Sequence, residues 1–160
     1  MKKKIYVLVG IAASGKSTYS MKLMDEHSGL LTKIINADTI RKRLYGDATI
    51  QGNPDEVFKE VYKEYTDALR DHTVLIVIDN TSLTYKMRKR YHQLADTIVP
   101  IFGNEFEYNL VFFTPNLKRS LEWNRKRSRQ VPEDVIEAQA NRFSGPNDKE
   151  VEYANIIRID

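Results

Sequence analysis

Residues 5–18 read Ile5-Tyr6-Val7-Leu8-Val9-Gly10-Ile11-Ala12-Ala13-Ser14-Gly15-Lys16-Ser17-Thr18. An apolar, β-branched run enters a turn of the pattern Gly-x-x-x-x-Gly-Lys-Ser, known as Walker A, and a stretch with helical spacing follows to Glu26. Glycines let the backbone wrap closely around an anion, so that successive N–H groups and the positive end of the following helix point at it. The stretch therefore predicts a strand, a phosphate-binding loop and a helix.

The side chains of this loop have separate expected tasks. We expect Lys16 to neutralise the β- and γ-phosphates of ATP or another nucleoside triphosphate, and Ser17 to place its hydroxyl on Mg²⁺. Thr18 fits a packing or capping position next to the nucleotide. The predicted nucleotide-binding residues of the loop are Gly10, Ala13, Ser14, Gly15, Lys16, Ser17 and Thr18. Such a loop predicts nucleotide binding but not the reaction, because switches, motors and kinases all use it.

Further apolar runs with β-branched character predict four more strands, at residues 33–35, 74–78, 108–113 and 155–159. Longer stretches with helical spacing separate these runs, which is typical of a parallel sheet with helices on both faces. The 160 residues show no repeat, linker or shift in composition. We therefore expect one α/β domain over residues 1–160.

The composition narrows the possible chemistry. The chain has no Cys and only 3 His, which excludes disulfide scaffolds and thiolate zinc sites and argues against a His-based metal site. No apolar run approaches the roughly 18 residues that span a bilayer, and no secretion signal is evident. We expect a cytoplasmic protein of a bacterial or phage-infected cell, with no membrane partner, whose chemistry uses oxygen, lysine and arginine groups.

Two charged residues follow the predicted strand at 33–35. Asp38 and Arg41 lie three residues apart on the first turn of a helix, so they share one face at the carboxyl edge of the sheet, where ligands bind in open α/β folds. Asp38 could accept the proton of an attacking hydroxyl, and Arg41 could hold an anionic part of the acceptor. The spacing fits equally well a helix that Asp38 only caps, with Arg41 as its ion-pair partner.

The strand predicted at 74–78 ends in Asp79. An apolar strand that closes on an aspartate is the Walker B arrangement, so Ser17 and Asp79 are the predicted magnesium ligands. Thr81 adds a hydroxyl beside the acceptor position. In the basic stretch that follows, Arg88 and Lys89 fit either contacts to the phosphate backbone of an acceptor or an exposed helix face.

Residues 115–130 carry six Lys and Arg against one Glu. A helix that starts at Thr114-Pro115, an arginine-rich turn and a second helix from Glu133 predict a lid over about 115–143 that closes over the triphosphate and excludes water. Arg127 or a neighbour would then stabilise charge on the transferred phosphoryl group.

These motifs together resemble the kinase domain of bacteriophage-type 5′-polynucleotide kinases over nearly the whole chain. The residues that carry the resemblance are Gly10 to Thr18, Asn36-Ala37-Asp38-x-x-Arg41, Asp79-Asn80-Thr81-Ser82-Leu83, and Asn124-x-x-Arg127 with Val131-Pro132. The resemblance implies that Asp38 is the general base, that Arg41 contacts the acceptor's 3′-side phosphate and that Arg127 contacts the donor phosphates. A shorter loop after Arg127 leaves Arg125 and Arg129 as rivals for that last role.

We therefore expect a P-loop NTPase fold of the kinase type, with a five-stranded parallel sheet and an arginine-rich lid. Its expected reaction is Mg²⁺-dependent transfer of the γ-phosphoryl group of ATP to a hydroxyl, namely the 5′-OH end of DNA or RNA. Zeta-toxin-like, antibiotic and sugar kinases share the first and third motifs, so a small-molecule acceptor such as a nucleoside, sugar or antibiotic is the alternative. A nucleotide-binding module without phosphoryl transfer is the third interpretation. The preferred nucleotide and the oligomeric state stay open.

Overall fold

A single five-stranded parallel sheet organises the computed structural model, which describes residues 1–160. Its strands lie in the order β2-β3-β1-β4-β5, and every neighbouring pair is parallel. The strands are β1 (Lys2–Val9), β2 (Thr32–Ile35), β3 (Leu75–Ile78), β4 (Glu105–Phe113) and β5 (Asn155–Ile159). All five predicted strands are confirmed. β1 and β4 begin earlier than expected because they pair residue by residue from Lys2 and Glu105 onward, through polar positions that carry no apolar signal.

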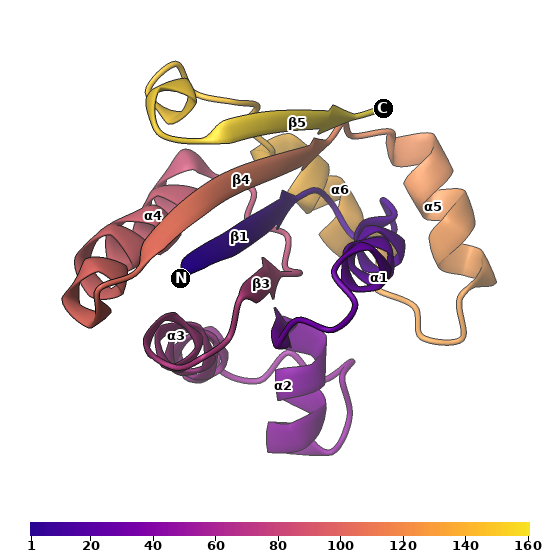
Figure 1. Cartoon of the computed structure of the whole chain (residues 1–160). Coiled ribbons are helices and arrows are strands. Elements are labelled where there is room, and N and C mark those ends of the chain that lie inside the picture. The colour runs from indigo at the N-terminus through magenta and orange to yellow at the C-terminus, as the bar shows by residue number, and fades with distance from the viewer.

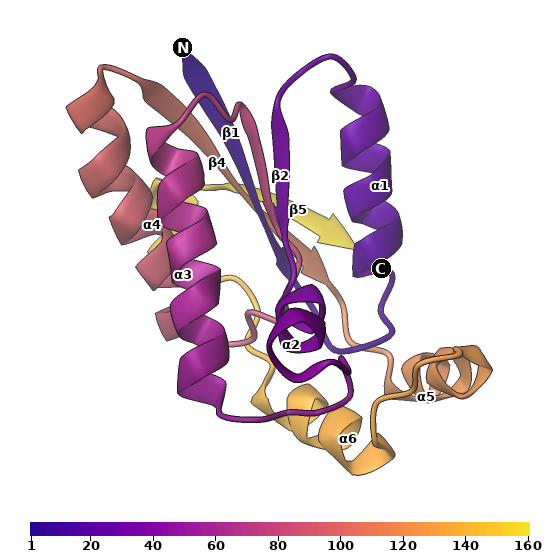
Figure 2. The same ribbon diagram turned by 90° about the horizontal axis from the view of Figure 1, so that it is seen from below.

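Helices cover both faces of the sheet (Figures 1 and 2). α3 (Pro54–Arg70) and α4 (Tyr85–Ile98) lie on one face, and α1 (Lys16–Glu26) lies on the other. A cluster of 19 buried residues fills the α3–α4 side, and a cluster of six that includes Leu8 and Leu23 lies beneath α1. Because β1 faces both clusters, its sequence from Ile5 to Val9 is continuously apolar or aromatic rather than alternating.

The sequence Asn53-Pro54, a capping side chain followed by a proline, predicts a helix start, and the structure confirms it as the N-terminus of α3. Asn53 is the cap and accepts the N–H of Asp55 at 3.0 Å, and Pro54 occupies the first helical position, where its missing N–H costs nothing. A fourfold spacing predicts that one face of this helix packs on the sheet, and all four residues that follow it are buried there: Val57, Val61, Tyr65 and Leu69.

The remaining helices gather near the carboxyl ends of the strands (Figures 1 and 2). They are α2 (Ala37–Tyr45), α5 (Leu117–Lys126) and α6 (Glu133–Arg142), and the turns η1 (Val99–Phe102) and η2 (Glu150–Glu152) are short 3-10 helices. The predicted start of α5 at Thr114-Pro115 is wrong. The N–H of Thr114 still donates to Ile159 of the sheet at 2.8 Å, and Asn116 caps the helix by accepting the N–H of Arg119.

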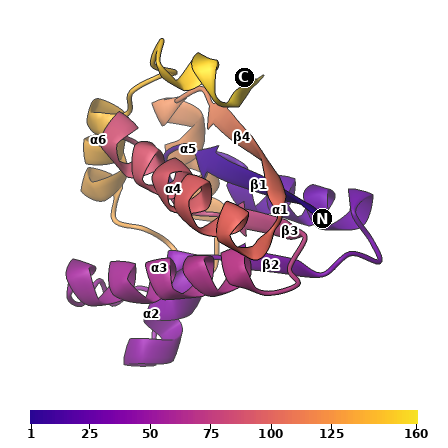
Figure 3. The same ribbon diagram turned by 60° about the vertical axis from the view of Figure 1, so that its left-hand side comes forward.

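The α5–α6 segment, residues 115–143, packs on the phosphate-binding loop through a small apolar cluster. Ile11 of the loop, Leu83 and Ile136 form its buried centre. Leu117 and Leu121, whose spacing in the sequence predicts that they face inward, pack around it. Figure 3 shows α6 near the N-terminal end of α4, on the side of the molecule away from the start of β1. No helix combines the length and the apolar character that crossing a membrane requires.

Candidate active site

The phosphate-binding loop joins β1 to α1. Its two glycines are each required, but for different physical reasons. Gly15 has φ of 97°, in the left-handed region that a side chain disfavours. A Cβ on Gly10 would lie 2.8 Å from Ser14 Oγ and 3.0 Å from Phe113 Cβ, so a larger residue would collide there. No side chain caps α1, which leaves the first N–H groups of the helix available to an anion.

The side chain of Lys16 folds back on this loop and lines the cavity beside it. Its ammonium group donates to the carbonyl oxygens of Gly10 at 3.1 Å and Ile11 at 2.7 Å. Burial lowers the pKa of Lys16 to about 8, and the nearby carboxylates of Asp79 and Asp38 oppose that shift. The hydroxyl of Ser14 is buried without a hydrogen-bond partner. A positive group and an unpartnered donor around free helix N–H groups form a cradle that fits a polyphosphate.

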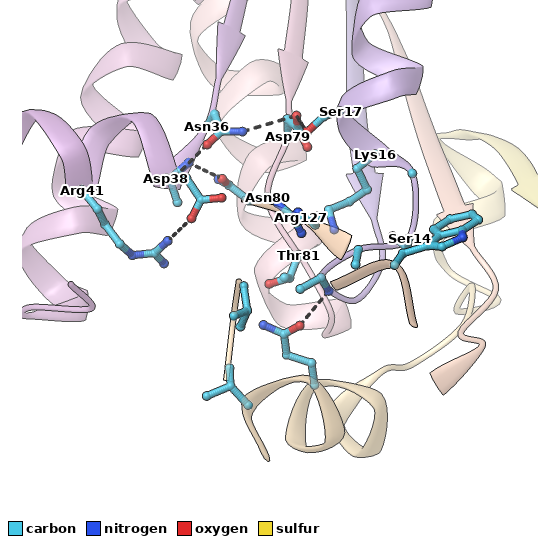
Figure 4. A pocket seen from close by; sticks show the side chains of 18 of the residues that line it. Ser14, Lys16, Ser17, Asn36, Asp38, Arg41, Asp79, Asn80, Thr81 and Arg127 are labelled. Carbon is cyan, nitrogen blue, oxygen red and sulfur yellow. Dashed lines mark hydrogen bonds and ion pairs between the residues drawn. The ribbon is translucent and has the colours of Figure 1, made fainter. Parts of the chain in front are cut away.

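Ser17 and Asp79 meet beside the loop. The Ser17 hydroxyl donates to Asp79 Oδ2 at 3.3 Å, and Asn36 Nδ2 donates to the same oxygen at 3.4 Å (Figure 4). Burial raises the pKa of Asp79, while Lys16 and these hydrogen bonds oppose the rise. A hydroxyl and a carboxylate are oxygen ligands that Mg²⁺ accepts. No cluster of three or more His, Asp or Glu exists in the chain, so phosphate oxygens and water would have to complete the coordination.

The structure separates the two interpretations of Asp38. Asn36 is the cap of α2, because its Oδ1 accepts the N–H groups of Asp38 at 2.8 Å and Thr39 at 3.2 Å. The cap interpretation of Asp38 is therefore wrong. The ion pair is present, with Arg41 Nη1 donating to Asp38 Oδ1 at 2.7 Å (Figure 4). Asn80 Oδ1 accepts the N–H of the first residue of α2 at 2.7 Å, which fixes this helix to the end of β3.

The three arginines at the end of α5 and in the loop before α6 lie in different places. Asn124 is buried and closes the loop with two hydrogen bonds to the backbone of Val131, at 2.7 and 2.9 Å. Within the closed loop, Arg127 lines the central cavity. Arg129 Nη2 donates to Asp38 Oδ2 at 2.7 Å. Arg125 instead pairs with Glu133 at 2.7 Å on the exposed surface and does not line the cavity, so it does not reach the predicted nucleotide site.

These elements surround a cavity of about 390 Å³. Its lining includes most predicted site residues, and Figure 4 shows several of them pointing toward one another across the cavity. Predicted residues in the lining are Ala13, Ser14, Gly15, Lys16, Ser17, Thr18, Asp38, Arg41, Asp79, Thr81 and Arg127. Gly10, the first residue of the loop, does not line the cavity, but its carbonyl oxygen accepts a hydrogen bond from the Lys16 ammonium group.

Arg88 lies outside this site, so its predicted role in acceptor binding is wrong. Its side chain is completely buried, and its guanidinium donates twice to buried Glu150, each time at 2.9 Å. It also donates to carbonyls of Leu83 at 3.0 Å and Ser144 at 3.2 Å, which ties α4 to the segment after α6. Lys89, the neighbouring residue, is exposed and lies over the ring of Tyr85 rather than in the cavity.

Several lining residues carry no motif and were missed. Gln139 of α6 accepts the N–H of Ala12 in the phosphate loop at 2.8 Å, which joins the α5–α6 segment to the loop. Gln51, Phe58, Met87, Trp123 and Val135 also line the cavity and belong to no motif. Asn36 and Val131 belong to the motifs of the resemblance but were not predicted to line the site, although asparagine just before a helix is a favoured cap.

Comparisons with known proteins agree with this geometry. A family model described as an AAA domain, AAA_33, matches residues 5–146. A search of the curated proteins found no match. Among solved structures, a gluconokinase from Sinorhizobium meliloti 1021 is similar with a TM-score of 0.63 and 18% identity, over 99% of this chain and 82% of that one.

Two further structures come from proteins of RNA metabolism. A fungal RNA kinase is similar with a TM-score of 0.71 and 14% identity over 100% of this chain. The Pnkp1/Rnl/Hen1 RNA repair complex contains a chain similar with a TM-score of 0.67 and 16% identity over 88% of this chain. This chain spans only 38% and 43% of those two chains. At these identities the similarity establishes the fold, which is that of P-loop kinases.

Proposed function

The chain belongs to the AAA_33 family of AAA domains, and from this family, its P-loop kinase fold and the residues of its cavity we propose that it is an ATP-dependent kinase. The proposed acceptor is a hydroxyl that lies next to a phosphate, as at the 5′-OH end of DNA or RNA. An RNA kinase and a chain of an RNA repair complex among the similar structures support this acceptor class.

The observation that carries the proposal is the position of Asp38 and Arg41 in the same cavity as Lys16. The Asp38 carboxylate can take the proton of the accepting hydroxyl as its oxygen bonds to the γ-phosphorus and the bond to the ADP oxygen breaks. The Arg41 guanidinium, 2.7 Å from that carboxylate, can hold an anion beside the hydroxyl. A switch or regulatory module has no use for such a pair.

On the donor side, Lys16, the loop N–H groups and Arg127 would hold the phosphates, and Ser17 with Asp79 would hold Mg²⁺. The metal ion would supply charge neutralisation on the β- and γ-phosphates. Arg127 lies in the α5–α6 loop, so the segment can act as a lid that excludes water during transfer.

The wall of the cavity is partly apolar. Phe58, Met87, Val131 and Val135 line the same cavity as Asp38. Side chains of this kind shield a flat, weakly polar group such as a nucleobase from water. An acceptor that combines a hydroxyl, a phosphate and a base therefore fits the lining better than a simple alcohol.

The proposal can be tested with labelled ATP and four acceptors offered separately. They are a 5′-hydroxyl oligonucleotide, a nucleoside 3′-monophosphate, the nucleoside alone and gluconate. We expect label on the first two acceptors. Arg41→Ala should lower kcat/KM for these by about 10- to 150-fold, the worth of a charged bidentate contact, and should scarcely change transfer to the nucleoside. Arg43→Ala is the matched control, because Arg43 has the same charge on the same helix but pairs with Glu60 outside the cavity.

A small-molecule kinase is the second candidate. The similarity to a gluconokinase and a cavity of about 390 Å³, within the usual range for small ligands, favour it. Label on gluconate or another small alcohol but not on the oligonucleotide or the nucleoside monophosphate would select this candidate and reject the nucleic acid end as the acceptor.

A further inference from the structure

Both oxygens of the Asp38 carboxylate are occupied in the structure. Arg41 donates to Oδ1 and Arg129 donates to Oδ2, each at 2.7 Å. A carboxylate has about four acceptor sites, so two stay free, but a guanidinium group in contact with each oxygen hinders the approach of a hydroxyl. If Asp38 is the base, as in the proposed function on which this inference rests, the departure of one arginine opens an oxygen to the hydroxyl before transfer.

Arg129 is the arginine that can leave. Arg41 is on the same helix as Asp38, three residues away, and stays beside it whatever the α5–α6 segment does. Arg129 reaches Asp38 from the loop closed by Asn124, across 91 positions of the sequence. Its side chain is 33% exposed, so an incoming acceptor can reach the guanidinium.

The charges at this point leave room for one anion. Two guanidinium groups converge on a single carboxylate, and the other carboxylate whose charge interacts with Arg129, that of Asp47, makes no ion pair with it. Arg41 Nε is also shielded from solvent and has no hydrogen-bond partner. A phosphate group, with three free oxygens, can bridge two arginines and supply the missing acceptors, whereas a neutral hydroxyl cannot.

We propose that Arg129 is a specificity-determining residue that moves from Asp38 to the phosphate of the acceptor. In the absence of that phosphate, Arg129 covers Asp38 Oδ2 and keeps the base from activating a hydroxyl. When the phosphate binds between Arg41 and Arg129, Asp38 Oδ2 becomes free to accept the proton. Water and simple alcohols carry no phosphate, so they leave the base covered, and ATP hydrolysis without acceptor stays slow.

The test compares wild type with Arg129→Gln, which removes the charge but keeps a polar side chain. We expect kcat/KM for a nucleoside 3′-monophosphate to fall about tenfold or more, because a charged contact is lost. Transfer to the nucleoside without phosphate and acceptor-free ATP hydrolysis should hold or rise, because Asp38 is uncovered. The ratio of the two kcat/KM values, phosphorylated over unphosphorylated acceptor, should therefore fall at least tenfold.

Lys126→Gln is the matched control, since it removes one positive charge from an exposed position at the end of α5, outside the cavity. It should leave the ratio unchanged. Isothermal titration of the nucleoside 3′-monophosphate gives a readout without turnover, in which Arg129→Gln should weaken binding by a similar factor and Lys126→Gln should not. Thermal unfolding confirms that both variants are folded.

An unchanged ratio and unchanged binding in Arg129→Gln would overturn the inference. If Arg41→Ala in that case still lowers kcat/KM for the phosphorylated acceptors and not for the nucleoside, the proposed function stands and only the role of Arg129 is lost. If wild type transfers no phosphoryl group to any of the acceptors, the proposed function fails before Arg129 is tested. Equal losses on both acceptors would assign Arg129 to the donor and would also reject the inference.

Discussion

Replacing Asp38 by asparagine separates proton transfer from helix structure. Asparagine keeps an oxygen at the same position but cannot take a proton at neutral pH. A positioned general base contributes on the order of 10² to 10⁴ in rate, so Asp38→Asn should lower kcat by about this factor. The N-terminus of α2 should stay intact, because Asn36 and not Asp38 accepts the two orphan N–H groups.

The stability cost follows from the exposure of the ion pairs. The Asp38 side chain is 37% exposed, and those of Arg41 and Arg129 are 21% and 33% exposed. Pairs that are this solvated contribute roughly 0.2 to 1 kcal/mol each, and some contribute nothing. Asp38→Asn should therefore lower the free energy of unfolding by about 1 kcal/mol, or roughly 2 to 4 °C in Tm for a chain of this size.

Single-turnover transfer from labelled ATP to a 5′-hydroxyl oligonucleotide measures the rate, and calorimetry measures Tm. Asn53→Ala is the contrasting variant, because Asn53 caps α3 and does not line the cavity. It should cost about 1 kcal/mol through the lost cap while Asp38 and the cavity stay intact. Turnover of Asp38→Asn within a few-fold of wild type would refute the assignment of the base, whatever its effect on Tm.

Three other outcomes are expected. Lys16→Ala should abolish most phosphoryl transfer and leave Tm within a few degrees of wild type, and near-normal turnover in a folded variant would contradict its donor role. Glu150→Gln should lower the unfolding free energy by about 3 to 5 kcal/mol in urea titrations, since it leaves the buried Arg88 guanidinium without its carboxylate. Burial lowers the pKa of His92 below 6.5, beside the stacked ring of Tyr153, so the unfolded chain binds its proton more readily. The stability of the folded state should thus fall as the pH drops below about 6.5. Between pH 7.5 and 5, the Tm of His92→Phe should fall less than the Tm of wild type.

The parts of this protein that the sequence determines by itself are those with a local physical cause. The apolar run before Gly10, the close approach at Gly10 and the positive φ at Gly15 force a strand, a tight anion-binding loop and a helix in that order. Asp79 follows from the same logic, because a fully buried strand that ends in a carboxylate must present it at the sheet edge. The fold class and half of the residues that line the cavity follow from motifs of this kind.

Only the tertiary structure decided which groups Arg88 and Arg129 contact. Arg88 and Lys89 are adjacent in a basic stretch, yet one is completely buried and the other is exposed. Nothing within a few residues of Arg88 indicates this, since its carboxylate partner, Glu150, lies 62 positions away. Likewise, Arg129 contacts Asp38 from a loop that lies 91 positions away in the sequence. A positive charge is the same in every sequence window, and only the packed fold determines which carboxylate it meets.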